Sequence, residues 1–506
     1  MKRPNDLFRL IKSMSKAEKR YFKLYASKHI ESERNNSVRL FDAIDAQAAY
    51  DQESIRRRFA GERFSRQLAV QKNYLYRVIL KSLRAFHAEA SPAIRIGEMM
   101  HTVEILANRG LYDQCVEILS AARHLALEHE EYALALKVQE LEGRVAYSIN
   151  DTGRLHHLQS EQDELTGLMA NIADYRRLSQ EMNEVVIRYG GDNHVEVRAR
   201  AEAILASDLL RDEALALSRH ARIRLHSLRM LCLSYCGDAA GSHRALRNCI
   251  EAIEAFPDPS PELQFRLLVC RAVALGIALA GSRFTEMDQD LEALKALRSG
   301  GLYMDHNVDL VVHRYTLARH IRTGAFDCAR EEAPLAEAIL RCPDPDIRNN
   351  LGFAMRFDLA HLYFICREFG RALDHVNAML MAAPANARAI REMTAAWLFG
   401  CILHFERGDM ETMLYMVNGA RRFMTRAKQK PKACTLFLGF LRRLANVVSA
   451  SAVPAEVRRF HGALERNGVA LAELRPYMIL DVEAWMAALL ERKEYGASYL
   501  AMCVGR

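Results

Sequence analysis

The stretch FAMRFDLAHLYFICREFGRALDHVNAMLMAAPAN, residues 353–386, decides the fold class of this chain. It contains two segments whose apolar residues recur with the period of an α-helix, separated by a short break in front of Phe369. The second segment begins with this aromatic residue, which can anchor it against the first. The stretch therefore predicts two α-helices that pack as a pair around a tight turn.

The same order of features recurs along the chain: an apolar helix, a tight turn, an anchor residue and a second apolar helix. The clearest anchors are Tyr112, Phe284, Phe326, Phe369 and Met410. In four of these units a glycine lies two or three residues before the anchor. Glycine adopts the positive φ that ends one helix and lets the chain reverse. The pattern therefore predicts a helical hairpin at each anchor.

The anchors are regularly spaced. After Phe284 the next three follow at intervals of 42, 43 and 41 residues, which indicates a repeat of about 42 residues. Weaker anchors continue this spacing at Leu155, Val195, Ala239, Val453 and Tyr495. Each helix pair leaves one apolar face uncovered, and the next pair can cover it. The spacing thus predicts a stack of helix pairs.

The unit at 353–386 resembles a tetratricopeptide repeat (TPR). The residues that match the TPR pattern are Leu359, Ala360 and Tyr363 on its first helix, Phe369 and Ala372 on its second, and Pro384 at its close. The neighbouring units keep Phe326, Ala329, Ala336 and Trp397 at matching positions. Two features depart from the TPR pattern: the repeat is longer than the usual length of about 34 residues, and Met287 and Met413 replace small residues.

The resemblance covers roughly residues 93–500 and implies an all-α fold, a right-handed α-solenoid of TPR-like helix-turn-helix repeats. The longer repeat implies helices longer than those of a TPR, and residues 473–492 are expected to form a closing helix. The segments SKAEKRYFKLYASKH (15–29) and KNYLYRVILKSLRAF (72–86) are similar to the opening of uncharacterised bacterial TPR-like proteins. That similarity implies no activity.

The composition agrees with a helical protein. The 506 residues include only 25 Gly and 12 Pro, few for a chain rich in turns. The longest apolar run, at 273–280, is shorter than the ~20 residues that cross a bilayer, and the N-terminus does not resemble a signal peptide. The eleven cysteines are scattered, which suits a reducing compartment. We therefore expect a cytoplasmic protein that does not enter a membrane.

The positive charge is confined to the start of the chain. Residues 1–90 contain 20 Lys and Arg against 10 Asp and Glu, whereas the rest contains 50 against 53. We expect two domains: a basic helical N-terminal module at 1–91, and a TPR-like solenoid at 92–506. Ser15 and Glu18 form an S-x-x-E capping box for the module's first clear helix. Further helices are expected at about 37–49, after Asp51, and at about 65–88.

The last helix of the module has two faces. Leu75, Val78, Ile79, Leu83 and Phe86 follow the helical period and predict a buried face. The other face of this helix carries basic residues, and the preceding helix adds more. Together the residues predicted to contact nucleic acid or another acidic surface are Arg56, Arg57 and Arg58 on the preceding helix and Lys72, Tyr74, Arg77, Lys81 and Arg84 on the last one. Two adjacent helices, the second of them basic, also suggest a helix-turn-helix module. The alternative is a solvated basic face on a docking domain.

Three arginines recur with the spacing of the repeat. Arg271, Arg314 and Arg356 are spaced by 43 and 42 residues on the first helices of three consecutive units, and His361 lies just beyond the last of them. In a TPR-like groove these residues could hold the carboxylates of a peptide. The alternative is that the arginines pack at the seams between helices, because Trp397 occupies the same place in its unit.

No catalytic motif is present, and we expect neither an enzyme nor a cofactor or metal site. The sequence lacks the phosphate-binding glycine loops, the zinc-protease motif and the nucleophile elbow. Cys232 and Cys236 have the spacing of two metal ligands but no matching second pair, and we interpret them as core residues. The sequence therefore predicts a non-enzymatic scaffold that binds a protein or peptide in the groove of the solenoid. The alternative is a regulator that binds nucleic acid through residues 1–91 and uses the TPR-like part as a sensor or dimerisation domain.

Overall fold

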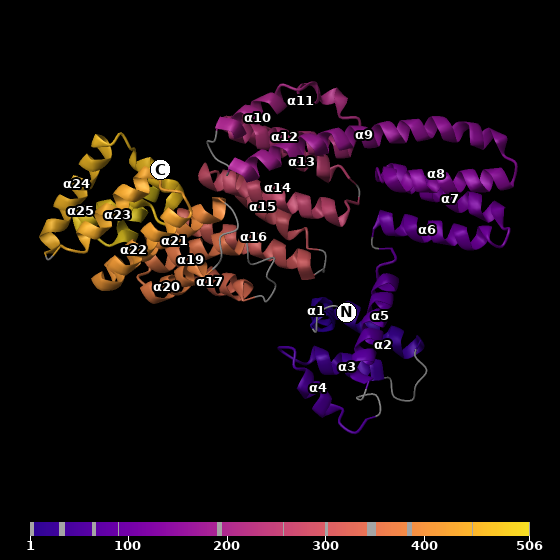
Figure 1. Ribbon diagram of the computed structural model, residues 1–506, viewed down its shortest axis with the longest axis horizontal. Helices are drawn as coiled ribbons and strands as arrows, with labels where there is room; N and C mark the ends of the chain where they lie inside the picture. The colour runs from indigo at the N-terminus through magenta and orange to yellow at the C-terminus, as the bar shows by residue number, and fades with distance from the viewer. Residues whose placement is uncertain are drawn as a thin grey trace. The chain divides into compact units, whose positions relative to one another are not determined.

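The computed structural model describes residues 5–29, 36–62, 67–89, 91–189, 195–256, 258–298, 302–341, 351–381, 387–447 and 449–504. Throughout these ranges the regular structure is helical, and no strand occurs in them (Figure 1). The prediction of an all-α protein is therefore confirmed. Most of the helices expected from apolar spacing are present, and the sequence explains where they begin.

Paired helices are joined by turns of one recurring geometry. In six of the pairs the second helix begins two residues after a residue with positive φ. These second helices are α7 (Tyr112–Glu128), α13 (Ala239–Glu254), α15 (Phe284–Lys295), α17 (Phe326–Leu340), α20 (Phe369–Leu380) and α22 (Met410–Arg426). The positive-φ residue is glycine at Gly110, Gly237, Gly324 and Gly408, as expected. At the other two turns it is Ser282 and Arg367, so Gly281 does not have the predicted role.

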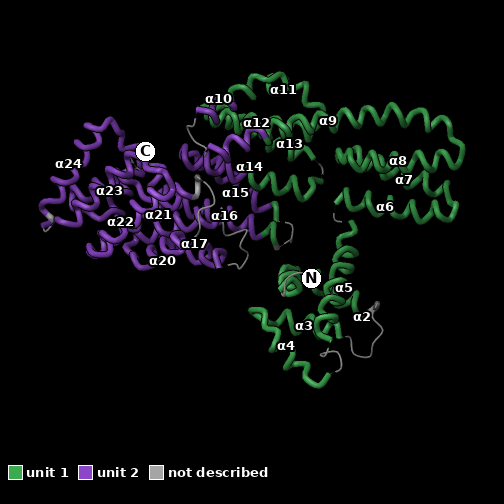
Figure 2. The backbone as a smooth tube through the Cα atoms, viewed as in Figure 1, with its two compact units in different colours: residues 1–180, 202–270, 297–305 green, residues 181–201, 271–296, 306–506 purple. Residues whose placement is uncertain are grey.

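The chain divides into two compact units, drawn in different colours in Figure 2. One comprises residues 1–180, 202–270 and 297–305, and the other comprises residues 181–201, 271–296 and 306–506. The division passes through α9 (Thr152–Tyr189), α10 (Val195–Leu205), α14 (Pro261–Ala280) and α16 (Leu302–Arg322). The two units are therefore described separately.

The first unit begins with five helices that share one core. They are α1 (Asp6–Ser13), α2 (Lys16–His29), α3 (Asn36–Asp45), α4 (Gln52–Arg58) and α5 (Leu68–Phe86). Buried apolar side chains from all five form this core, with Phe22 stacked on Phe41 at 4.5 Å between ring centroids. The predicted capping box is present, since the backbone N–H of Ser15 donates to the Glu18 carboxylate and that of Glu18 donates to the Ser15 hydroxyl. These residues correspond to the predicted N-terminal module.

The rest of the first unit consists of longer helices. They are α6 (Pro92–Ala107), α7, α8 (Tyr132–Ser148), the first part of α9, the end of α10, α11 (Asp208–Arg211), the short 3₁₀ turn η2 (Glu213–Leu215), α12 (Arg219–Cys236), α13, the start of α14 and the start of α16. Adjacent helices α6, α7 and α8 pack on one another, and so do α12 and α13. Helix α9 is one continuous helix of 38 residues. The predicted anchors Leu155 and Val195 lie near the start of α9 and at the start of α10, and residues 152–189 contain no proline to break the helix between them.

The second unit is built mainly from consecutive helices that pack on their neighbours in the chain. Its elements are the end of α9, most of α10 (Val195–Leu205), the end of α14, α15, most of α16 (Leu302–Arg322), α17, α19 (Leu351–Ile365), α20, α21 (Ala387–Glu406), α22, α23 (Lys432–Leu444), η3 (Ala450–Ala452), α24 (Val453–Arg466), η4 (Leu471–Tyr477), α25 (Val482–Glu491) and α26 (Tyr495–Val504). Trp485 is fully buried among aromatic rings of its core. The closing helix expected at 473–492 is instead η4 followed by α25, because Asp481 caps a new helix. Pro384 lies outside the described residues.

One helix requires a separate comment on membranes. Helix α14 is long and apolar enough to cross a bilayer, with a mean hydropathy of 1.8 over its most apolar part. It also contains Arg271, whose guanidinium pairs with the buried Asp290 carboxylate at 2.6 Å. An ion pair in the middle of the helix and side chains packed on protein are also found in core helices of soluble proteins. Length and composition alone therefore do not make α14 a membrane span.

Candidate functional site

Helix α5 presents a basic stripe on its exposed side. Tyr74, Arg77, Lys81 and Arg84 are all exposed, as predicted, and they follow one another at steps of three and four residues. The three cations form no ion pair with any residue that the structure describes. Because no carboxylate neutralises them within the described part of the chain, they are available to an acidic ligand.

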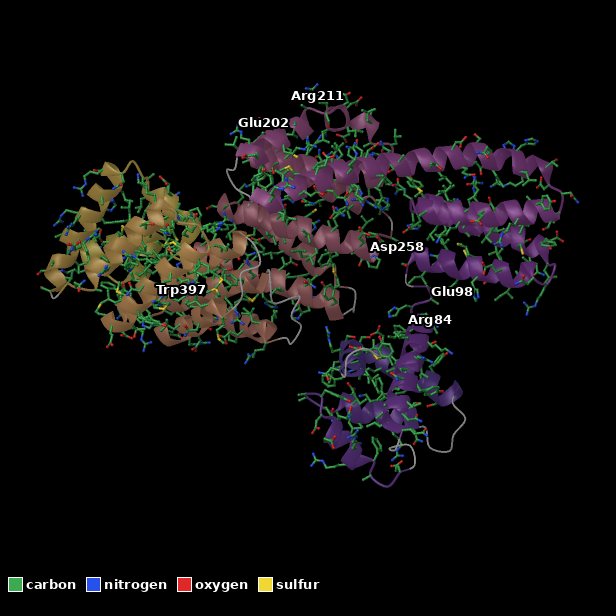
Figure 3. All side chains as sticks on the ribbon, in the orientation of Figure 1. Arg84, Glu98, Glu202, Arg211, Asp258 and Trp397 are labelled. Atoms are coloured by element: carbon green, nitrogen blue, oxygen red, sulfur yellow. The ribbon has the colours of Figure 1, made fainter. Side chains whose placement is uncertain are left out.

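The stripe borders a groove of about 730 Å³ between α5 and α6. Its walls are formed by Arg77, Leu80, Lys81, Leu83, Arg84, His87, Ile94 and Glu98. Leu80 and Ile94 are 39% and 41% exposed, so the floor of the groove is apolar and accessible. Figure 3 shows Arg84 and Glu98 at the junction of α5 and α6. Glu98 is the one carboxylate among these residues, and cations therefore dominate the rim.

Packing against α2 holds α5 in place. Leu75, Val78 and Ile79 are buried in the module's core, as expected. At the end of the helix the His87 ring meets the Glu18 carboxylate with 2.6 Å between Nε2 and Oε1. Burial alone would raise the pKa of Glu18, but hydrogen bonds from His87 and Ser15 outweigh it and lower the pKa. The Glu18 carboxylate is thus bound by His87 and Ser15, and it pairs with none of the three cations of the stripe.

Two predicted features of α5 are wrong. Lys72 is buried, and its ammonium donates to the Tyr50 hydroxyl at 2.6 Å and to the Gln52 side chain at 3.2 Å. It therefore stabilises the module and is no surface contact. Phe86, expected in the core, is 39% exposed and packs edge-on against Tyr21. Leu80 was the residue that the prediction missed, although it lies on the same helical face as Arg77, Lys81 and Arg84.

The arginines of α4 form a separate basic cluster. Arg56, Arg57 and Arg58 are all exposed. Arg56 pairs with Glu53 at 2.9 Å, and Arg57 lies 4.0 Å from Asp51, so two of the three have a local carboxylate. Nine residues separate α4 from α5, and α5 packs mainly on α2. A helix-turn-helix has a connection of about three or four residues, so this arrangement departs from that motif.

The predicted arginine row is largely enclosed. Arg271 is 9% exposed and bound to Asp290, and its guanidinium is therefore not open to a peptide. Arg314 lies over the Tyr315 ring at 4.5 Å and has its Nε 3.5 Å from Asp358. Arg356 is only partly exposed and also has an interaction within the protein. Arg271 and Arg314 thus pack within the protein, as the alternative stated.

His361 also belongs to the interior. It is 8% exposed and its Nε2 lies 2.8 Å from the Tyr495 hydroxyl. Burial lowers the pKa of His361 to about 4, so the ring is neutral at pH 7. Burial also raises the pKa of Asp358 to about 6, against the opposing charge of Arg314. The prediction that Arg271 and His361 contact a peptide is therefore wrong, because Arg271 pairs with Asp290 and His361 with Tyr495 inside the protein.

The described residues contain no cluster of three or more His, Cys, Asp or Glu side chains that could hold a metal ion. Cys232 is buried on α12, as a core residue would be, and Cys236 is partly buried. No protein-family model matches the chain. No curated protein matches its sequence.

Proposed function

We propose that this chain is a non-enzymatic binding protein whose groove between α5 and α6 holds an acidic, amphipathic helix of a partner protein. One observation carries the proposal: an accessible apolar floor is bordered by cations that have no ion partner among the described residues. An amphipathic helix places apolar side chains into such a groove and its charged side chains on the rim. Carboxylates on the partner would complement Arg77, Lys81 and Arg84.

The dimensions of the stripe agree with a short helical ligand. Arg77 and Arg84 are seven residues apart, which is about two turns and ~10 Å along α5. A partner helix with apolar residues at positions i, i+3, i+4 and i+7 covers the same length. The proposed ligand is therefore a segment of two to three turns within a longer helix.

We further propose that residues 92–506 form a right-handed α-solenoid with a repeat of about 42 residues, similar to TPR proteins. The start positions of α13, α15, α17, α20, α22, α24 and α26 support this proposal, because each coincides with an anchor found by spacing. Neighbouring helices from α19 to α23 also pack on one another in sequence. Such stacks serve as platforms for other proteins. A cytoplasmic location remains part of the proposal and rests on the scattered cysteines.

Nucleic acid is the second candidate ligand, through residues 1–91. The net charge of this region, the exposed arginines of α4 and the exposed Tyr74 favour it. An acidic helix fits the groove better, because phosphate backbones offer nothing to the apolar floor formed by Leu80, Leu83 and Ile94. Nucleic acid would also contact the arginines of α4, whereas a helix in the groove between α5 and α6 would not. This difference allows a test.

The test compares two charge reversals in the full-length chain. One variant carries Arg77→Glu, Lys81→Glu and Arg84→Glu, and the matched control carries Arg56→Glu, Arg57→Glu and Arg58→Glu. The probe is a labelled peptide of about 18 residues, long enough to form a helix, with leucines on one face and glutamates on the other. Its binding is measured by fluorescence anisotropy.

The α5 variant is expected to lose at least about tenfold in affinity for the peptide, equivalent to ~1.4 kcal/mol, whereas the α4 variant keeps it. Equal losses in both variants would contradict the groove assignment. A DNA duplex at low salt serves as the second probe, because phosphate contacts are strongest there. Tight duplex binding that both variants abolish would favour the nucleic-acid alternative.

A further inference from the structure

A second charged cavity lies within the first compact unit, away from α5. It measures about 300 Å³, opens to solvent and is lined by the start of α8 and by α9, α12 and α14. Three arginines from three different helices line it: Arg176 on α9, Arg224 on α12 and Arg266 on α14. Its apolar wall is formed by Met169, Ile172, Ile223 and Leu263. The cavity thus combines a cluster of guanidinium groups with an apolar surface.

The arginines are poorly neutralised by the protein. Arg176 and Arg224 form no ion pair with any residue in the described ranges. Arg266 lies 3.7 Å from Glu262, one turn earlier on the same helix, and the Glu262 side chain is 79% exposed. An ion pair of this exposed kind contributes little. Three acidic residues line the cavity, and two of them, Glu131 and Glu262, could oppose the charge of the three guanidinium groups.

The third carboxylate at the cavity is already bound. Glu130 accepts hydrogen bonds from the backbone N–H groups of Arg219 and His220, each at 2.9 Å, at the N-terminus of α12. The His220 ring and the Arg219 side chain also contact it, at 3.0 and 3.3 Å. Its charge is thus compensated by groups other than the three cavity arginines. Glu130 therefore does not neutralise the guanidinium cluster, and the exposed Glu262 is the carboxylate that pairs with one of its members, Arg266.

We propose that this cavity binds an organic phosphate, with the phosphate group held by Arg176, Arg224 and Arg266 and the organic part against the apolar wall. Guanidinium groups bind phosphate oxygens in pairs, in a planar geometry that suits a doubly charged group. A carboxylate group carries one charge, and a dicarboxylate such as succinate carries its two charges on separate groups, so neither compensates three converging cations at one point as a phosphate group does. The volume suits a small metabolite, since ligand cavities begin at about 300 Å³.

The electrostatics of the ligand-free protein agree with this assignment. Burial lowers the pKa of Arg224, and the charges of Arg266 and Arg176 lower it further. The folded protein therefore holds a partly buried cation beside two others, which destabilises it in the absence of an anion. A site that retains such an arrangement has the properties of an anion receptor.

The test uses the full-length chain and three phosphate-containing or control anions: inorganic phosphate, glycerol 3-phosphate and succinate, each at the same ionic strength. Binding is measured by isothermal titration calorimetry on the wild type, on Arg224→Gln and on Arg266→Gln. The matched control is Arg222→Gln, because Arg222 is exposed on the same helix but does not line the cavity. Thermal unfolding without ligand is measured for all four proteins.

Wild type and Arg222→Gln are expected to bind glycerol 3-phosphate more tightly than inorganic phosphate, and to bind succinate least. Arg224→Gln and Arg266→Gln should weaken phosphate binding by about tenfold or more, the effect of losing one charged hydrogen-bond donor. Arg224→Gln should also unfold at a higher temperature than wild type when no ligand is present. Absence of saturable phosphate binding, equal losses in Arg222→Gln, or tighter binding of succinate would overturn the proposal.

Discussion

The carboxylate of Glu130 provides the most quantitative test of how the first unit is held together. It joins the turn between α7 and α8 to the N-terminus of α12, which is 89 residues further along the chain. Burial raises the pKa of Glu130, but hydrogen bonds from the His220 ring and from the backbones of His220 and Arg219 outweigh it and lower the pKa to about 2. We predict that Glu130→Gln destabilises the contact between the α7–α8 turn and α12 at neutral pH.

The size of the effect follows from this pKa. The ordinary value is 4.5 and the folded value is about 2, a displacement that corresponds to about 3 kcal/mol at neutral pH. The side chain is only 9% exposed, so solvent screens it little. Because the folded pKa is lowered, this stabilisation is fully present above pH 4.5 and is lost as the pH falls toward 2. A glutamine retains part of the hydrogen bonding, and we therefore expect a loss of about 2–3 kcal/mol.

Hydrogen exchange followed by mass spectrometry measures this loss locally. Peptides from α8 and α12 should exchange about 30 to 150 times faster in Glu130→Gln than in wild type at pH 7. The control is Glu131→Gln, which changes the neighbouring carboxylate and should leave exchange almost unaltered. The difference between Glu130→Gln and wild type should shrink as the pH is lowered below 4.5. Equal exchange in the two variants at pH 7 would refute the reasoning.

Three further predictions concern the second unit, where Trp397 and Trp485 report unfolding by fluorescence. Asp290→Ala should lower the free energy of unfolding by about 3–5 kcal/mol, because it leaves Arg271 buried without its carboxylate; a change below 1 kcal/mol would contradict this. His361→Asn should remove a loss of stability that wild type shows as the pH falls from 6.5 toward 4, where the unfolded ring binds a proton and the folded ring does not; identical pH profiles would contradict it. Gly419→Ala should destabilise the protein by about 1–3 kcal/mol, since the new Cβ would lie 2.5 Å from the Trp397 ring; unchanged urea unfolding would show that the ring is not packed there.

Much of the helical architecture could be predicted from the sequence because it depends on local patterns. The anchors Phe326, Phe369 and Met410 begin helices in the structure because a turn residue with positive φ precedes each of them. Glycine marks two of these three turns. The turn before Phe369 uses Arg367 instead, and a positive φ at arginine leaves no signal in the sequence.

The sites were harder to predict because they depend on contacts between distant residues. The burial of Lys72 follows from Tyr50 and Gln52, which are 22 and 20 residues away and on no shared periodic pattern. The same reason hides the cavity with Arg176, Arg224 and Arg266, since each arginine comes from a different helix. The basic stripe of α5 was predictable because all its members lie on one helix. The apolar floor of the groove could not be predicted in the same way, because one of its residues, Ile94, lies on α6.

Charge exchange between the groove and its ligand tests the central claim most directly. The chain with Arg77→Glu, Lys81→Glu and Arg84→Glu is titrated with two labelled peptides that share the leucine face, one carrying glutamates and the other lysines. The proposal predicts that the variant loses the acidic peptide and gains the basic one, whereas wild type shows the opposite preference. If the variant binds neither peptide more tightly than wild type does, the groove between α5 and α6 is not the binding site.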